Sequence, residues 1–126
     1  MGKRILVIDD DTDILEVLEL MLTQEGYEII ARQTGGYAED FVALDPQLVL
    51  LDVRIKGYPR SGVEICREFK SSSLFGSIPV LLLSSEHNLP ELAEKSGCDG
   101  YISKPFEMMA LLGKLNSFLN TGEHGK

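Results

Sequence analysis

The sequence predicts an α/β fold built around a parallel β-sheet that is buried on both faces. Short, unbroken apolar runs recur along the chain, and amphipathic helical patterns separate them. Two of these runs, Ile5–Ile8 and Leu48–Leu51, lead directly into aspartates. Continuous apolar strands of this length are typical of parallel sheets, because helices cover both faces of such sheets. The alternation of strands and helices then requires right-handed crossover connections.

The chain has the size and composition of one globular domain. Its 126 residues can bury a single core, which we expect to span residues 1–120, followed by a polar tail over 121–126. No apolar run is long enough to cross a bilayer, and only four apolar residues follow Lys3 and Arg4 before the first acids. We therefore predict a cytoplasmic protein that has neither a signal peptide nor a membrane anchor.

Charge and cysteine content narrow the classes of partner. The net charge of -8 argues against direct binding of nucleic acid or anionic membranes, since both are bound through excess Lys and Arg. Cys66 and Cys98 fall in different predicted elements and lack a C-x-x-C spacing, so packing is favoured over a disulfide or a zinc site.

The first half of the chain predicts three strands and two helices. Apolar residues recur at helical spacing over Thr12–Glu25, with Asp11 or Thr12 as the N-cap and Gly26 as the stop. A second helix is predicted over residues 37–44, before Pro46. The three strands are predicted over residues 4–8, 27–32 and 47–52, the second of them as an edge strand.

The second half of the chain predicts two strands and three helices. After a loop over residues 53–60, Ser61 and Glu64 have the spacing of a capping box and begin a helix. Its inner face is predicted to hold Val63, Ile65, Cys66 and Phe69. The remaining elements are predicted as a strand over 79–83, a short helix over 90–96 that stops at Gly97, a strand over 100–103 and a helix over 108–118.

Five strands and five helices in this length fit the flavodoxin-like strand order 2-1-3-4-5. In that order the first and third strands are neighbours, so Asp9 and Asp10 are expected to lie beside Asp52. The ends of the fourth and fifth strands bring Ser84 and Lys104 to the same edge. Ligands of open parallel sheets bind beyond the carboxyl ends of the strands, and this edge is therefore the predicted site.

Clustered carboxylates predict a particular chemistry at this edge. Like charges raise one another's pKa values unless a cation is present, and oxygen ligands with an open position favour Mg²⁺ over Ca²⁺. A metal at Asp52 would neutralise an incoming phosphoryl group, while Ser84 and Lys104 hold its remaining oxygens. The carboxylate itself can then act as the nucleophile and form an aspartyl phosphate. Taken one at a time, each of these residues also fits a purely structural role; Asp52, for example, could simply begin a turn.

These residues resemble the receiver domain of two-component response regulators, the CheY-like superfamily, over nearly the whole chain. The similar segments are Asp9–Asp11, the strand that ends at Asp52, the strand that ends in Ser84-Ser85, and Gly97–Phe106. The resemblance implies that Asp52 is the phosphoacceptor. It also implies that Asp10, Asp52 and the backbone carbonyl of Arg54 ligate Mg²⁺, with Asp9 acting mostly through water.

The resemblance further implies a switch and a set of partners. Lys104 would bind the phosphate and precede a cis bond to Pro105, while Ser84 and Tyr101 would move when the phosphoryl group arrives. The face formed by the fourth helix, fifth strand and fifth helix would change. A sensor histidine kinase or histidine phosphotransfer protein would supply the phosphoryl group. A downstream effector protein or domain, or a phosphorylation-dependent dimer, would respond, and the chain would assist its own phosphorylation without being a true enzyme.

Two departures from the family pattern affect the surroundings of the site. The loop between Asp52 and Gly62 is about two residues longer than usual, and Lys56 stands where most members have proline. The segment between Ser84 and Lys104 is about two residues short, which predicts a short or irregular fourth helix. We also hypothesise that Arg54 and Glu86 pair over the site and slow hydrolysis of the phosphoryl group, although exposed charges often contribute little.

Other functional classes use similar residues. Residues 9–13 have the spacing of the start of a calcium loop, but Ile14 and Leu20 stand where that loop needs Gly and Glu. A haloacid-dehalogenase-type phosphatase would use Asp9 as its nucleophile, but the chain has no room for a cap and no acidic pair after Lys104. A receiver-like interaction module that no longer accepts phosphate remains an open alternative.

Overall fold

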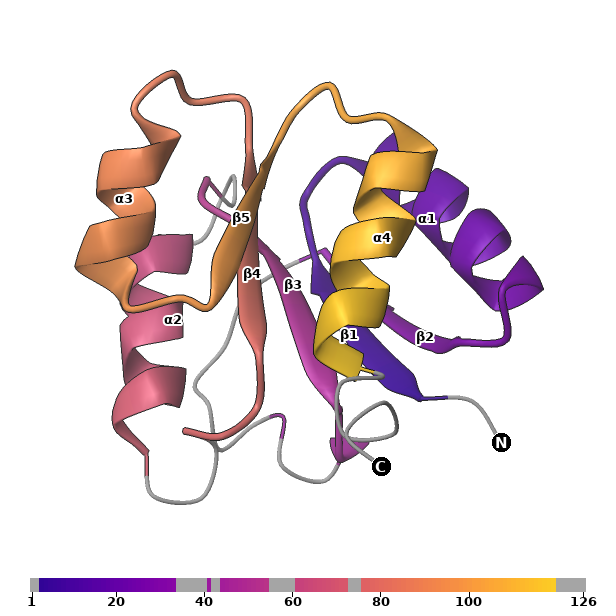
Figure 1. Cartoon of the computed structure of the whole chain (residues 1–126), viewed down its shortest axis with the longest axis horizontal. Helices are drawn as coiled ribbons and strands as arrows, with labels where there is room; N and C mark the ends of the chain where they lie inside the picture. The colour runs from indigo at the N-terminus through magenta and orange to yellow at the C-terminus, as the bar shows by residue number, and fades with distance from the viewer. Residues whose placement is uncertain (1–2, 34–40, 42–43, 55–60, 73–75, 120–126) are drawn as a thin grey trace.

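Five parallel strands form one sheet in the computed structural model, which describes residues 3–33, 41, 44–54, 61–72 and 76–119. The strands are β1 (Arg4–Ile8), β2 (Glu28–Arg32), β3 (Leu48–Asp52), β4 (Val80–Ser84) and β5 (Gly100–Ser103). Their order is β2-β1-β3-β4-β5, so the predicted strand order is confirmed (Figure 1).

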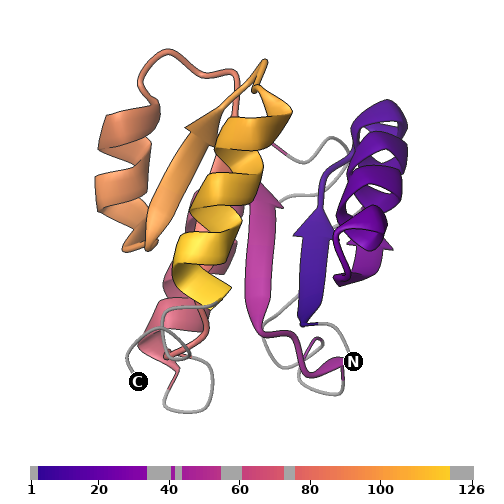
Figure 2. The ribbon, with the colours of Figure 1, turned by 45° about the vertical axis from the view of Figure 1, so that its right-hand side comes forward.

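Four helices cover the two faces of the sheet in the described part of the chain. They are α1 (Thr12–Gln24), α2 (Gly62–Ser71), α3 (Leu89–Ser96) and α4 (Met108–Leu119). Helices α1 and α4 lie on one face, and α2 and α3 lie on the other (Figures 1 and 2). None of these helices has the length and apolar content needed to cross a bilayer.

Some predicted segments fall wholly or partly outside the described residues. The helix predicted over residues 37–44 is one of them, but Phe41 from that segment is described and stacks on Phe69 with ring centroids 6.1 Å apart. The tail predicted over 121–126 and most of the loop over 53–60 also lie outside. Helix α3 has only eight residues, in agreement with the short segment between Ser84 and Lys104.

Local capping chemistry fixes where the helices begin and end. The Asp11 carboxylate accepts hydrogen bonds from the backbone N–H groups of Asp13 and Ile14, which identifies Asp11 as the N-cap of α1. Ser61 and Glu64 form both hydrogen bonds of the capping box at the start of α2. Gly97 ends α3 in the left-handed conformation, with φ of 75°, which glycine adopts without steric cost.

Two apolar cores hold the central strands between the helix layers. Alternate residues of β1, β3 and β4 point to opposite faces, and nearly all are completely buried. Leu6, Val49 and Leu82 pack toward α2 and α3, whereas Val7 and Leu50 pack toward α1 and α4. Because both cores hold the same three strands, the carboxyl ends of these strands are held in a fixed relation, and the predicted site lies there.

Candidate functional site

Asp9 immediately follows β1 and is completely buried. Its backbone N–H donates a hydrogen bond to the Arg32 carbonyl at 3.0 Å, which ties it to the end of β2. Its Oδ1 accepts from the Asp11 N–H at 2.9 Å, and its Oδ2 accepts from Lys104 Nζ at 2.8 Å. Both oxygens of Asp9 therefore have hydrogen-bond partners within the protein, and its side-chain partner is Lys104. That Asp9 would contact a metal mostly through water, as the family resemblance implies, stays a prediction.

Asp52 is the last residue of β3, and only 9% of its side chain is exposed. Its Oδ1 lies 3.6 Å from Lys104 Nζ, so the lysine contacts Asp52 less closely than it contacts Asp9. Burial first, and then the charge of Asp9, raise the pKa of Asp52 to about 7, although Lys104 offsets part of this effect. In the absence of a metal this carboxyl group therefore binds a proton near neutral pH.

The carboxylates of Asp9, Asp10 and Asp52 can place one oxygen each within 4.8 Å of the others. Asp10 is partly exposed at the open side of this group, and the other two are buried. Oxygen ligands at this spacing, with excess negative charge, suit a small hard divalent cation such as Mg²⁺. The acidic group thus fits the metal that the sequence predicted, and receiver domains typically bind Mg²⁺ at such a group.

Ser84 and Lys104 reach the same edge from β4 and from the residue after β5. The Ser84 side chain is buried, and its Oγ accepts a hydrogen bond from the Glu86 N–H at 3.0 Å. The Lys104 N–H donates to the Ser84 carbonyl at 2.8 Å, which joins the ends of these two strands. The peptide bond between Lys104 and Pro105 is cis.

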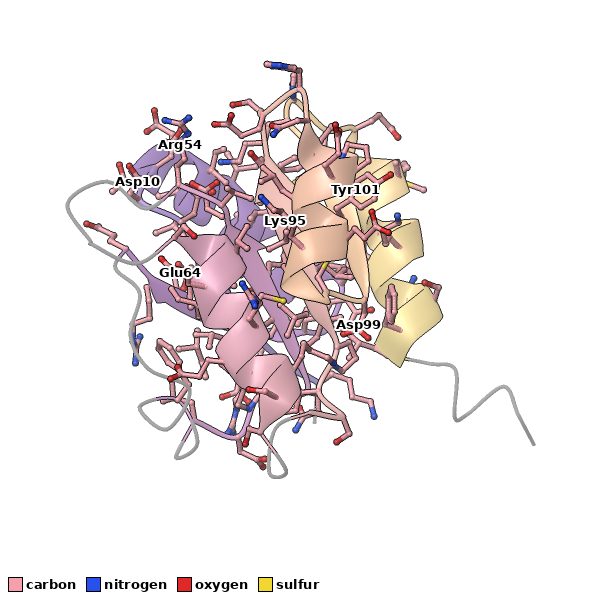
Figure 3. All side chains as sticks on the ribbon, turned by 90° about the vertical axis from the view of Figure 1, so that its left-hand side faces the viewer. Asp10, Arg54, Glu64, Lys95, Asp99 and Tyr101 are labelled. Carbon is pink, nitrogen blue, oxygen red and sulfur yellow. The ribbon has the colours of Figure 1, made fainter. Side chains whose placement is uncertain are left out.

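Two further predicted residues, Arg54 and Tyr101, lie at the periphery. Arg54 forms an ion pair with Glu86, and the Arg54 side chain is 80% exposed beside the acidic edge that carries Asp10 (Figure 3). Tyr101 lies on β5, away from the acids, and is 38% exposed. Lys114 Nζ lies 5.7 Å from the centroid of its ring and donates a hydrogen bond to the Tyr101 carbonyl at 3.3 Å.

Gly62 is a residue of the site that the sequence interpretation did not single out. Its N–H donates to the Val53 carbonyl at 2.7 Å, and a Cβ added to it would lie 2.1 Å from the Asp52 carbonyl oxygen. Only glycine therefore lets α2 begin directly against the end of β3. A glycine immediately after the N-cap serine was a detectable signal, because glycine often marks close approach of two backbone segments.

Comparisons with known proteins agree with this geometry. The family model of the response regulator receiver domain matches residues 5–116. The chain belongs to this family. The receiver domain of DrrB is 32% identical, with a TM-score of 0.77 over 95% of this chain and 99% of that one. The receiver domain of NtrX from Brucella abortus is 29% identical, with a TM-score of 0.81 over 93% and 98% of the two chains.

Chains of similar length and longer regulators both resemble this receiver domain. A CheY-like receiver protein from Methanospirillum hungatei is 27% identical, with a TM-score of 0.79 and complete coverage of both chains. Longer regulators also match: the chain spans 54% of the Thermotoga maritima OmpR/PhoB homologue DrrB and 28% of Brucella abortus NtrX.

Proposed function

We propose that this receiver domain accepts a phosphoryl group on Asp52 within a two-component phosphorelay. The observation that supports the proposal best is the buried Asp52 carboxylate, which shares one edge of the sheet with two further carboxylates and Lys104. A carboxylate oxygen of Asp52 attacks the phosphorus of a phosphohistidine on a sensor kinase or phosphotransfer protein. The bond between nitrogen and phosphorus breaks, and the imidazole leaves with the electron pair and takes up a proton.

Electrostatics at the edge supports this transfer. Asp10, Asp52 and the Arg54 carbonyl would hold Mg²⁺, which when bound neutralises charge on the phosphoryl oxygens. Asp52 must be ionised to attack, and Lys104 together with the metal charge favours the ionised form. Lys104 is positioned to follow the developing charge, because its Nζ already lies between Asp9 and Asp52. The lysine thus serves as a pre-positioned cation for the transferred group.

Phosphorylation is proposed to act on the face formed by α3, β5 and α4. The Ser84 Oγ would give up its contact with the Glu86 N–H and donate its own O–H to a phosphoryl oxygen. Tyr101, which is partly exposed on β5, would then turn toward the space that Ser84 leaves. A downstream effector, or a second copy of the chain, would bind the two arrangements unequally. We also propose a cytoplasmic location, because the proposed phosphodonor is a sensor kinase or a phosphotransfer protein.

The ion pair between Arg54 and Glu86 is proposed to slow loss of the phosphoryl group. It joins the residues two positions after Asp52 and after Ser84, and Figure 3 shows Arg54 next to Asp10. Such a pair hinders the approach of a hydrolytic water. We expect Arg54→Ala to shorten the lifetime of the phosphorylated protein, measured as the decay of the adduct by intact mass. An unchanged lifetime would refute this role.

Intact mass spectrometry after incubation with Mg²⁺ and acetyl phosphate tests the main proposal. We expect one labile adduct, which is absent in Asp52→Asn and when EDTA replaces Mg²⁺. Sustained turnover of p-nitrophenyl phosphate would instead indicate a phosphatase. Absence of both the adduct and Mg²⁺ binding would indicate an interaction module without phosphorylation.

A further inference from the structure

A groove of about 490 Å³ lies between α2 and α3, beside the proposed phosphoacceptor. The two helices lie side by side on the same face of the sheet (Figure 3). The apolar lining of the groove comes from Val53, Val63 and Leu92. Val53 and Arg54, which also line the groove, directly follow Asp52 in the chain. This volume lies within the range of about 300 to 1,000 Å³ that is typical of ligand sites.

The charged lining of the groove is mainly cationic. Arg54, Arg67 and Lys95 line it, and Glu86 is the only acid among the described lining residues. Glu86 is already paired with Arg54. Neither Arg67 nor Lys95 forms an ion pair with any residue that the structure describes, and both are exposed. Figure 3 shows Lys95 on the side of α3 that faces α2. The groove thus presents two cations that lack an acidic partner within the described chain.

This local charge is opposite to that of the molecule as a whole. The chain carries 20 acidic and 12 basic residues, for a net charge of -8. An acidic partner is therefore repelled by most of the surface and attracted to a small cationic part of it. Such a contrast orients the encounter and favours one docking position.

We propose that the groove binds an acidic segment of a partner protein, with one apolar side chain against Val63 and Leu92 and carboxylates paired with Arg67 and Lys95. The apolar lining favours a peptide over a free phosphate, because a phosphate gains nothing from it. Two N–H groups at the start of α2 are also already used: Gly62 donates to the Val53 carbonyl, and Glu64 donates to Ser61 Oγ. This helix terminus therefore has little remaining capacity for a phosphate.

Fluorescence anisotropy with the whole unphosphorylated chain tests this proposal. The probe is a fluorescein-labelled peptide of Asp and Glu residues around a single Leu. We expect the double variant Arg67→Gln/Lys95→Gln to bind it about tenfold more weakly than the wild type, and binding to weaken as salt is added. The double variant Lys3→Gln/Lys114→Gln removes the same charge away from the groove, and it should bind within about twofold of the wild type.

Amide chemical-shift mapping locates the peptide on the folded protein. Shifts centred on Val63, Arg67, Leu92 and Lys95 support the proposal. Shifts centred elsewhere, equal weakening in the two double variants, or binding of inorganic pyrophosphate without binding of the peptide would each overturn it. Acetyl phosphate should form the same adduct on both double variants, because neither changes a residue of the proposed phosphorylation site. The two proposals can therefore fail separately.

Discussion

Neutralising Asp52 tests the electrostatics of the site without any phosphorylation. The pKa of Asp52 is raised from its ordinary value of 3.8 to about 7, mainly by burial and by the nearby charge of Asp9. A carboxyl group with a higher pKa in the folded state binds its proton more tightly there than in the unfolded chain. Ionisation of Asp52 therefore destabilises the metal-free fold progressively as the pH rises from about 4 to about 7.

The size of this effect follows from the pKa difference. At about 1.4 kcal/mol per pKa unit, a rise from 3.8 to about 7 corresponds to an upper limit of about 4 kcal/mol at pH values above 7. Solvent screens the charge of Asp52 only weakly, because only 9% of its side chain is exposed. Replacing Asp52 by Asn also removes the ion pair with Lys104, whose Nζ lies 3.6 Å from Asp52 Oδ1. We therefore expect Asp52→Asn to be about 2 to 4 kcal/mol more stable than the metal-free wild type at about pH 8.

Urea unfolding in EDTA, followed by circular dichroism, measures this difference. The excess stability of Asp52→Asn should shrink as the pH is lowered, and it should nearly disappear at about pH 3, where the wild-type carboxyl group is mostly protonated in both the folded and the unfolded state. Glu19→Gln is the matched control, because it neutralises an exposed carboxylate on α1 and should change stability by less than about 0.5 kcal/mol.

A variant no more stable than the wild type at about pH 8 would contradict the reasoning. So would a stability gap that does not depend on pH. In the first case burial and the charge of Asp9 would not be raising the pKa of Asp52, and in the second case the gap would come from packing.

Three further predictions concern the metal, the close backbone contact and a buried polar contact. Differential scanning fluorimetry should show that Mg²⁺ raises the midpoint of thermal unfolding of the wild type by more than it raises that of Asp10→Asn. Equal increases in the two proteins would mean that the metal binds elsewhere. Urea unfolding should show that Gly62→Ala lowers the free energy of unfolding by more than about 3 kcal/mol, because the added Cβ would meet the Asp52 carbonyl. The control Gly113→Ala, which adds a Cβ into open space on α4, should raise the free energy of unfolding by up to about 1 kcal/mol. In the same assay, Asp99→Ala should lower the free energy of unfolding by about 1 to 3 kcal/mol, because Asp99 Oδ2 accepts hydrogen bonds from Lys70 Nζ and from the Val80 N–H, both at 2.8 Å. A decrease below about 0.5 kcal/mol would mean that water replaces the carboxylate.

The order of elements could be predicted because its signals are local. Continuous apolar runs predicted the buried strands β1, β3 and β4, and capping residues such as Ser61 and Gly97 predicted helix boundaries to within one or two residues. Strand order followed from the count and alternation of elements rather than from any single residue. The N-cap of α1 remained ambiguous between Asp11 and Thr12, because both side chains can accept the same N–H bonds.

The grouping of site residues could also be predicted, because parallel strands place their carboxyl ends at one edge. The individual contacts could not. Nothing in the sequence indicates that Lys104 Nζ lies nearer to Asp9 than to Asp52, since that depends on side-chain rotamers set by the packed sheet. The contact between Gly62 and the Asp52 carbonyl likewise arises only when α2 is placed against β3.

The distribution of hydrogen bonds among the acids explains why Asp52 is the reactive carboxylate in the proposed transfer. Asp9 is completely buried, and it accepts hydrogen bonds from Lys104 and from the Asp11 N–H, so its charge is largely compensated. Asp10 is partly exposed, and water can stabilise it. Asp52 is buried, and its nearest cation within the described chain is shared with Asp9. In the proposed transfer, Asp52 would gain most from a bound metal, because the cation would supply the charge compensation that this carboxylate lacks within the described chain.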